Sequence, residues 1–347
     1  MIKLSQPPKS ICIFRLSAIG DVTHILPVIH TLKKVWPKCK ITWIIGTLEY
    51  QLVKSLPEVE FIQFDKSKGW SAYLTLRQQL KGQTFDVLLM MQAALRASIA
   101  SLYIPAQYKL GFDKAWGVDY QWLFSNQKII GADRVHVLDT CFQFLKALGI
   151  EERVNCWDLP IDDSDLLFAE QLIRNKPTVI INPCSSMRKN NWRTWSVEGY
   201  AKVCDYLHQN NIQVFITGAP SNSEKEFCQS VVDQCQSNPK NLAGQTSLGQ
   251  LLALIKGAKF IVAPDTGPAH MATIVDTPVV ALYASTNPLR AGPYKSQSVL
   301  VNRYPSALQQ FKQKTVAEAH WGERVRYSQV MDSISIEDVK KAIDSLL

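Results

Sequence analysis

Apolar and polar positions alternate in a regular rhythm along the first half of the chain. The short apolar runs predict strands at residues 10–16, 40–45, 60–64 and 85–91, and the amphipathic stretches between them predict helices. Residues 134–148 have helical spacing and are followed by Gly149, which is typical of a helix that ends at a glycine cap. This succession predicts βαβ units and a mostly parallel sheet.

The same rhythm returns in the second half, after an acid-rich stretch at 150–176 that predicts a linker. Further strands are expected at 178–182, 213–217, 259–263 and 278–282, with helices at 196–209, 223–234 and 248–255. We therefore expect an α/β protein with two Rossmann-like domains, 1–165 and 166–330. Residues 331–347 predict a terminal helix, capped by Ser335, that docks back towards the N-terminal domain.

A late apolar run leads into the most informative turn, Asp265-Thr266-Gly267-Pro268. Asp265 or Thr266 can cap the helix that Pro268 opens, and Gly267 allows close backbone approach. Unpaired N–H groups and the positive end of a helix dipole then point to one place, which suits a phosphate. His270 projects back from the first helical turn. An ordinary capped strand-to-helix turn explains the segment about equally well.

A second small-residue turn follows the first predicted strand, at residues 17–20, and Asp21 comes directly after it. Asp21 is a candidate general base, although the capping preference alone favours a helix cap. No Gly-x-Gly-x-x-Gly is present there, so no nicotinamide or flavin cofactor is expected. Ligand sites of parallel sheets lie at the carboxyl ends of strands, so we expect both turns to face one cleft. Pro27 predicts a helix that is kinked or that begins near Leu26.

Three other polar segments follow predicted strands. The loop after 178–182 carries hydroxyl and basic side chains that could bind a diphosphate or form a solvated loop: Ser185, Ser186, Arg188 and Lys189. Glu224, or alternatively Glu226, could accept hydrogen bonds from ribose or simply start a helix. In the first domain, candidates for an anionic acceptor are Arg96, Lys114 and His136, which could also be exposed cations and a structural histidine.

The composition of the chain limits the classes of partner that it can bind. The chain has 347 residues, of which 46% are hydrophobic and 20% charged, with a net charge of +8 that favours anionic partners. The charge is spread along the chain without a nucleic-acid-binding signature, so a phosphorylated substrate and an anionic membrane face fit better than nucleic acid. We found no membrane-spanning run or signal peptide and expect a cytoplasmic protein. The eight cysteines lack Cys-x-x-Cys spacing, and no metal site is expected.

Taken together, these segments resemble the heptosyltransferase-type glycosyltransferases of family 9. The segment from Arg15 to Pro27 looks like the family's amino-terminal motif, and Asp265-Thr-Gly-Pro-Ala-His270 looks like its nucleotide-binding signature. The resemblance implies a GT-B fold, with two parallel sheets facing across a cleft. It also implies an inverting, metal-independent transfer from a nucleotide-sugar donor, ADP-heptose in characterised members. The acceptor would be an anionic, lipid-linked sugar of the lipopolysaccharide inner core, met at the cytoplasmic membrane face by peripheral association.

The resemblance also implies roles for single residues. Asp21 matches the catalytic base, and the donor diphosphate would lie near Ser185, Ser186, Asp265, Thr266, Gly267 and His270. Glu224 falls near the ribose-binding acid and Thr246 near the base pocket, while Arg15 joins the candidates for acceptor binding. Asn190 stands where the family commonly has Lys or Arg, so Arg188 or Lys189 is expected to neutralise the leaving group. Trp116-Gly117 replaces a position where relatives often have arginine.

Two rival functions fit the same architecture. A nucleotide-sugar epimerase with a GT-B shape would act on the donor alone, and a non-catalytic nucleotide- or polyanion-binding protein would show no turnover that depends on an acceptor.

Overall fold

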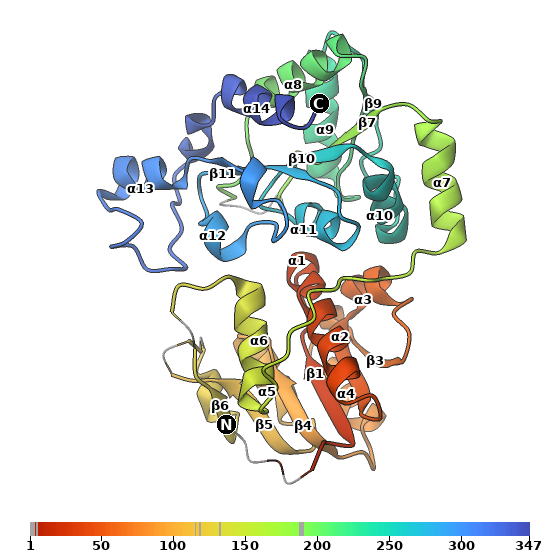
Figure 1. Ribbon diagram of the computed structural model, residues 1–347, viewed down its shortest axis with the longest axis vertical. Coiled ribbons are helices and arrows are strands. Elements are labelled where there is room, and N and C mark those ends of the chain that lie inside the picture. Colours follow the sequence, from red (N-terminus) through yellow and green to blue (C-terminus); the bar gives the residue numbers. More distant parts are fainter. Residues whose placement is uncertain (1–3, 5, 115, 118, 132, 187–190) are drawn as a thin grey trace. The chain divides into compact units, whose positions relative to one another are not determined.

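The computed structural model describes residues 4, 6–114, 116–117, 119–131, 133–186 and 191–347 (Figure 1). The chain divides into two compact units, Met1–Pro160 and Ile161–Leu347. The division lies a little before the boundary expected at residue 165. Each unit folds around its own parallel sheet.

Within the described residues, six parallel strands form the first sheet, in the order β3-β2-β1-β4-β5-β6. They are β1 Ser10–Phe14, β2 Lys40–Gly46, β3 Val59–Phe64, β4 Phe85–Met90, β5 Ala106–Phe112 and β6 Gln127–Ile129. The helices between and after them are α1 Ile19–Thr23, α2 Ile25–Val35, α3 Thr47–Val53, α4 Ser71–Gln79, α5 Leu95–Ser101 and α6 Val137–Ala147. The central strand β1 is almost wholly buried, as expected for a parallel strand covered on both faces.

Pro27 and Gly149 act as the sequence predicts. The helical segment after β1 is broken at His24, and α2 begins at Ile25, so that Pro27 lies in its first turn, where a missing N–H breaks no helical hydrogen bond. Gly149 adopts φ +84°, the left-handed conformation that ends α6.

In the second unit, the described residues form a sheet of six parallel strands in the order β12-β11-β10-β7-β8-β9. They are β7 Thr178–Ile181, β8 Gln213–Ile216, β9 Lys240–Asn241, β10 Phe260–Pro264, β11 Val279–Tyr283 and β12 Val301–Asn302. The helices are α7 Asp163–Ile173, α8 Val197–Gln209, α9 Asn222–Gln234, α10 Leu248–Gly257, α11 Gly267–Ile274, α12 Pro288–Ala291, α13 Tyr304–Lys312 and α14 Ile336–Asp344. The two sheets confirm the expected α/β class.

Helix α7 corrects the second half of the linker expected at 150–176, whereas residues 151–162 form neither helix nor strand. The acidic residues that suggested a linker include Asp163 and Asp165 in the first helical turn, where negative charge favours the helix dipole. The helix packs against α10 so closely that a Cβ at Gly249 would lie 2.0 Å from an Asp165 carboxylate oxygen. A Cβ at Gly257 would lie 2.5 Å from the Ile173 Cδ1 atom. These contacts place α7 with the second unit.

The terminal helix α14 also packs on the second unit. The Ser335 hydroxyl accepts a hydrogen bond from the Asp338 N–H at 3.1 Å, which confirms the predicted cap. Val339 and Ile343 are buried, and the helix contacts α8. Its docking towards the first domain stays a prediction. No helix in the described parts of the chain combines the length and apolar character needed to cross a bilayer.

Candidate active site

Asp21 lies in the third position of α1, just beyond the carboxyl end of β1. Its Oδ2 atom accepts a hydrogen bond from the Ala18 N–H at 3.1 Å and pairs with the Arg15 guanidinium, 2.6 Å from Nη2. The Arg15 side chain is 13% exposed and that of Asp21 is 35% exposed. The carboxylate is therefore held in one orientation by a largely buried cation, while part of it stays open to a ligand.

The end of β4 fixes the turn that carries Asp21. The side-chain oxygen of Gln92 accepts hydrogen bonds from the Leu16 and Ser17 N–H groups, at 3.0 and 3.1 Å. Arg15 also donates to the Met91 carbonyl. The one sign of this role in the sequence is that Gln92 is the first amide side chain after a buried strand. The turn is thus pinned by the neighbouring strand before any substrate binds.

The four candidates for acceptor binding have different surroundings in the structure. Arg15 pairs with Asp21, the candidate base, and its role in acceptor binding stays a prediction. His136 is buried, and its Nδ1 accepts the Leu138 N–H at 3.1 Å as the cap of α6. Arg96 and Lys114 are exposed cations of the first unit. Acceptor binding by Arg96, Lys114 and His136 stays a prediction.

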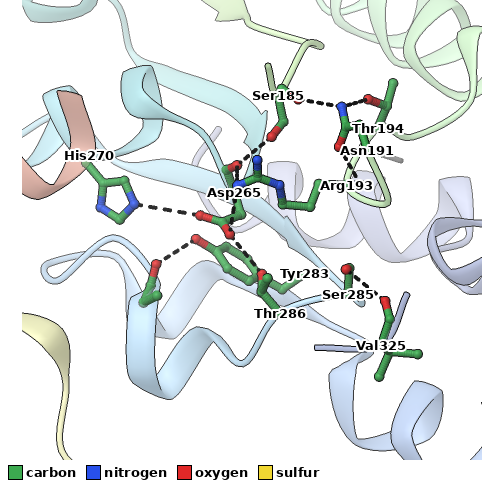
Figure 2. Close-up of polar contacts among 11 residues, drawn as sticks. Ser185, Asn191, Arg193, Thr194, Asp265, His270, Tyr283, Ser285, Thr286 and Val325 are labelled. Atoms are coloured by element: carbon green, nitrogen blue, oxygen red, sulfur yellow. Dashed lines mark hydrogen bonds and ion pairs between the residues drawn. The ribbon is translucent and has the colours of Figure 1, made fainter. Parts of the chain in front are cut away.

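The late turn forms as the sequence predicts, with α11 beginning at Gly267 and Thr266 as its N-cap residue. Asp265 does not cap this helix. Its Oδ2 atom accepts hydrogen bonds from Thr286 Oγ1 at 3.0 Å and Arg193 Nη1 at 3.3 Å, and His270 Nε2 lies 3.9 Å from Oδ1 (Figure 2). The turn therefore surrounds a buried carboxylate. Thr266 and Gly267, and not the Asp265 side chain, form the start of α11.

Two further contacts tie the loop after β7 to the same aspartate. The Ser185 hydroxyl donates to the Asp265 carbonyl at 2.9 Å, and Arg193 Nη1 donates to it at 3.1 Å (Figure 2). Asn191 closes the loop by donating to the Ser185 carbonyl. Ser186 is exposed, while the candidates Arg188 and Lys189 lie outside the described residues. Diphosphate binding by Ser185 and Ser186 stays a prediction.

Arg193 is the cation that sequence analysis missed. The signal available was its place in the same polar loop as Arg188 and Lys189, between two tryptophans. Burial by itself raises the pKa of Asp265, but the His270 ring, the Arg193 guanidinium and the Thr286 hydroxyl lower it to about 2. Asp265 is therefore ionised at neutral pH.

This low pKa predicts an acid-dependent loss of stability. Because the folded pKa lies below the ordinary value of 3.8, the ionised Asp265 stabilises the fold fully above pH 3.8, and the contribution is lost as the pH falls through about 2. Relative to Asp265→Asn, the natural chain should lose about 2 kcal/mol of unfolding free energy between about pH 5 and pH 1. Urea unfolding followed by tryptophan fluorescence at successive pH values measures this difference. Parallel pH profiles for the two proteins would contradict it.

Glu224, a donor candidate, lies beside the turn that follows β8. Glu224 is buried, and its Oε2 atom accepts the Ala219 N–H at 2.8 Å, whereas the alternative Glu226 is exposed. The Gly244 N–H donates to the Gly218 carbonyl at 2.9 Å, which joins this turn to the loop that carries Thr246. Ribose and base binding by Glu224 and Thr246 stay predictions. Among the described side chains, no group of three or more His, Cys, Asp or Glu is arranged to hold a metal ion.

Comparison with known proteins decides the family. Residues 73–320 match the family model described as glycosyltransferase family 9 (heptosyltransferase). The chain belongs to this family. Lipopolysaccharide core heptosyltransferase OpsX of Haemophilus influenzae is 40% identical to it over 336 residues, 96% of each chain. Lipopolysaccharide heptosyltransferase 3 of Escherichia coli is 24% identical over 77% of this chain and 80% of the relative.

Solved structures of family 9 proteins share the fold. A glycosyltransferase of family 9 from Veillonella parvula superimposes with a TM-score of 0.79 at 22% identity, covering 97% of each chain. The Escherichia coli heptosyltransferase WaaC with ADP superimposes with a TM-score of 0.72 at 20% identity, covering 97% of this chain and all of WaaC. These likenesses confirm the expected GT-B fold class. Family membership confirms that the chain is a glycosyltransferase of the heptosyltransferase type, which favours it over the two rival functions.

Proposed function

We propose that this family 9 enzyme transfers heptose from ADP-heptose to an anionic, lipid-linked acceptor of the lipopolysaccharide inner core, inverting the anomeric carbon without a metal. The Haemophilus influenzae relative, 40% identical along nearly the whole chain, is named a lipopolysaccharide core heptosyltransferase. A structure with the same fold is described as WaaC with ADP-2-deoxy-2-fluoro heptose. The observation in this chain that carries the proposal is the oriented, partly open carboxylate of Asp21 at the end of β1.

In this mechanism Asp21 is the general base. Its carboxylate takes the proton of an acceptor hydroxyl while that oxygen forms a bond to the anomeric carbon, and the bond from this carbon to the nucleotide diphosphate breaks on the opposite face. Arg15 holds the carboxylate at 2.6 Å, so little reorientation is needed during the transfer. The nucleoside diphosphate leaves with the bonding electron pair.

The second unit binds the donor in this proposal. The backbone N–H groups at the start of α11, in the Thr266–Gly267 turn, bind the diphosphate in this proposal. The positive end of the helix dipole favours the negative charge of the diphosphate. Arg193, together with Arg188 or Lys189, supplies the positive charge that stabilises the leaving group. Glu224 binds the ribose hydroxyls and Thr246 lines the base pocket.

The net charge of +8 supports an anionic acceptor and peripheral attachment to the cytoplasmic face of the inner membrane. Surface lysines and arginines attract an anionic lipid surface without insertion of a helix.

One experiment tests the activity directly. The purified chain is incubated with ADP-heptose, ADP-glucose or UDP-glucose, each with and without truncated, phosphorylated core lipids, and products are identified by mass spectrometry. A mass increase of one heptose on the core lipid, dependent on ADP-heptose, is expected. Altered donor in the absence of acceptor would support an epimerase, and nucleotide binding without any product would support a non-catalytic protein.

Arg15 provides a test of how the base is positioned. Because Arg15 pairs with Asp21, Arg15→Met is expected to lower kcat by roughly 10²-fold while the acceptor KM changes by less than about threefold. Arg15→Lys, which retains the charge, should recover part of the loss. Steady-state kinetics with the acceptor varied measure both parameters. A rise in acceptor KM with little change in kcat would instead assign Arg15 to acceptor binding.

A further inference from the structure

A cationic pocket lies in the second unit, outside the residues assigned to the donor. It has a volume of about 580 Å³ and is lined by Arg290, Lys312, Gly322, Arg324, Arg326 and Tyr327. Four of these six side-chain positions are basic, and none is acidic. The pocket is therefore a concentration of positive charge in a hollow of the surface, which selects for an anion that fits into it.

The segment that carries Arg324 and Arg326 is anchored at Val325, the residue between them. Between Arg324 and Arg326, the backbone N–H of Val325 donates to the Ser285 carbonyl at 2.9 Å, and the Ser285 hydroxyl donates to the Val325 carbonyl at 2.9 Å (Figure 2). The side chain of Val325 is fully buried. The backbone between the two arginines is thus held by Ser285, just after β11.

The carboxylate next to Arg324 in the sequence, that of Glu323, is paired with two lysines. Glu323 pairs with Lys312 at 2.8 Å and with Lys314 at 3.4 Å, and its backbone carbonyl accepts the Tyr304 hydroxyl at 2.9 Å. Within the described chain, the guanidinium groups of Arg324 and Arg326 have no ion-pair or hydrogen-bond partner. Both arginines are exposed and accessible to a ligand.

The pocket adjoins the Asp265 site. A small cavity is lined by Asp265 and Thr286 as well as by Arg290, Gly322 and Arg324, so three residues are common to both hollows. A ligand seated on the arginines would therefore lie beside the residues that hold the late turn. This position beside the candidate donor turn favours an anionic group of a substrate over a membrane surface.

We propose that this pocket binds a phosphate group carried by the acceptor sugar, with Arg324 and Arg326 as its specificity-determining residues. Guanidinium groups match phosphate oxygens with paired N–H donors, and Tyr327 offers a further hydroxyl donor. The volume accommodates a phosphate together with part of the sugar that bears it. The proposal rests on the proposed function for the identity of the phosphorylated sugar, whereas the anion site itself depends only on these residues.

Binding is tested first, on the full chain, independently of transfer. Calorimetric titration with inorganic phosphate and with glucose 6-phosphate is carried out in saturating ADP, which occupies the donor site, and is repeated without ADP. The double variant Arg324→Ala/Arg326→Ala is expected to bind both anions about tenfold more weakly, or weaker still. The control Arg77→Ala/Lys256→Ala removes two exposed positive charges elsewhere and should bind them like the natural chain. Equal affinity in the pocket variant and the control would overturn the proposal.

Transfer kinetics then identify the source of the phosphate. With a phosphorylated, delipidated acceptor, the pocket variant should show about a tenfold higher acceptor KM, with donor KM unchanged. With the dephosphorylated acceptor, the variant and the natural chain should be alike. A raised donor KM would assign the pocket to the nucleotide. Loss of binding to phosphatidylglycerol vesicles, with unchanged KM for the delipidated acceptor, would assign it to the membrane, and either result overturns the proposal. If no heptose is transferred, the titration still decides whether the anion site exists.

Discussion

Asp21→Asn is expected to lower the kcat of heptose transfer by about 10²–10⁴, because the amide cannot take the proton of the acceptor hydroxyl. Asn keeps the size of the side chain and an oxygen that can accept the Ala18 N–H. Arg15 loses its anionic partner, but it keeps its contact with the Met91 carbonyl. The expected loss is therefore mainly a loss of chemistry, with little change in the fold of the turn.

The control separates chemistry from folding. Asp158→Asn changes an exposed carboxylate of the same unit and should leave kcat within about twofold. Binding of ADP, measured by calorimetry, and the unfolding midpoint should be nearly unchanged in Asp21→Asn. Turnover close to that of the natural chain at saturating substrates would remove Asp21 from the role of base.

Asp265→Ala is expected to lower the free energy of unfolding by about 3 kcal/mol. The substitution leaves the half-buried Arg193 guanidinium without its carboxylate and takes the acceptor from the Thr286 hydroxyl. The Asp265 carbonyl still accepts hydrogen bonds from Ser185 and Arg193, which limits the damage. Because the same side chain supports the start of α11, ADP should also bind about tenfold more weakly.

Urea unfolding at neutral pH measures the stability change. Asp233→Ala, on the exposed face of α9, removes a comparable side chain and should change the free energy of unfolding by less than about 0.5 kcal/mol. The free energy of unfolding of Asp265→Asn should lie between those of the natural chain and Asp265→Ala, since the amide oxygen of Asn can still accept a hydrogen bond. A stability equal to that of the natural chain in Asp265→Ala would show that the buried pair contributes nothing net.

The succession of strands and helices could be predicted because it depends on residues that are close together in the sequence. Apolar runs, Gly149 and Pro27 each act within a few residues, and the structure follows them. Helix α7 could not be predicted in the same way, because its acidic first turn resembles a solvated linker and its buried side faces α10, which is distant in sequence.

In the candidate site, too, local features could be predicted from the sequence and contacts between distant residues could not. Asp21 and Asp265 could be located from the sequence because each follows a buried strand at a turn. Their partners could not, because the pairing of Arg193 with Asp265 spans 72 positions and depends on the neighbouring strands β7 and β10. The ion pair of Arg15 with Asp21 could not be predicted either, because the two residues are separated by a turn and their spacing alone does not show that they bind each other.

The tight packing of α7 against α10 determines where the protein can be cut. A recombinant piece starting at residue 177, which the acid-rich stretch would suggest, would strip α7 from α10 and expose apolar surface that the intact chain covers. Such a piece should aggregate. One starting at Ile161 keeps the helix and is the natural choice for studying nucleotide binding in isolation.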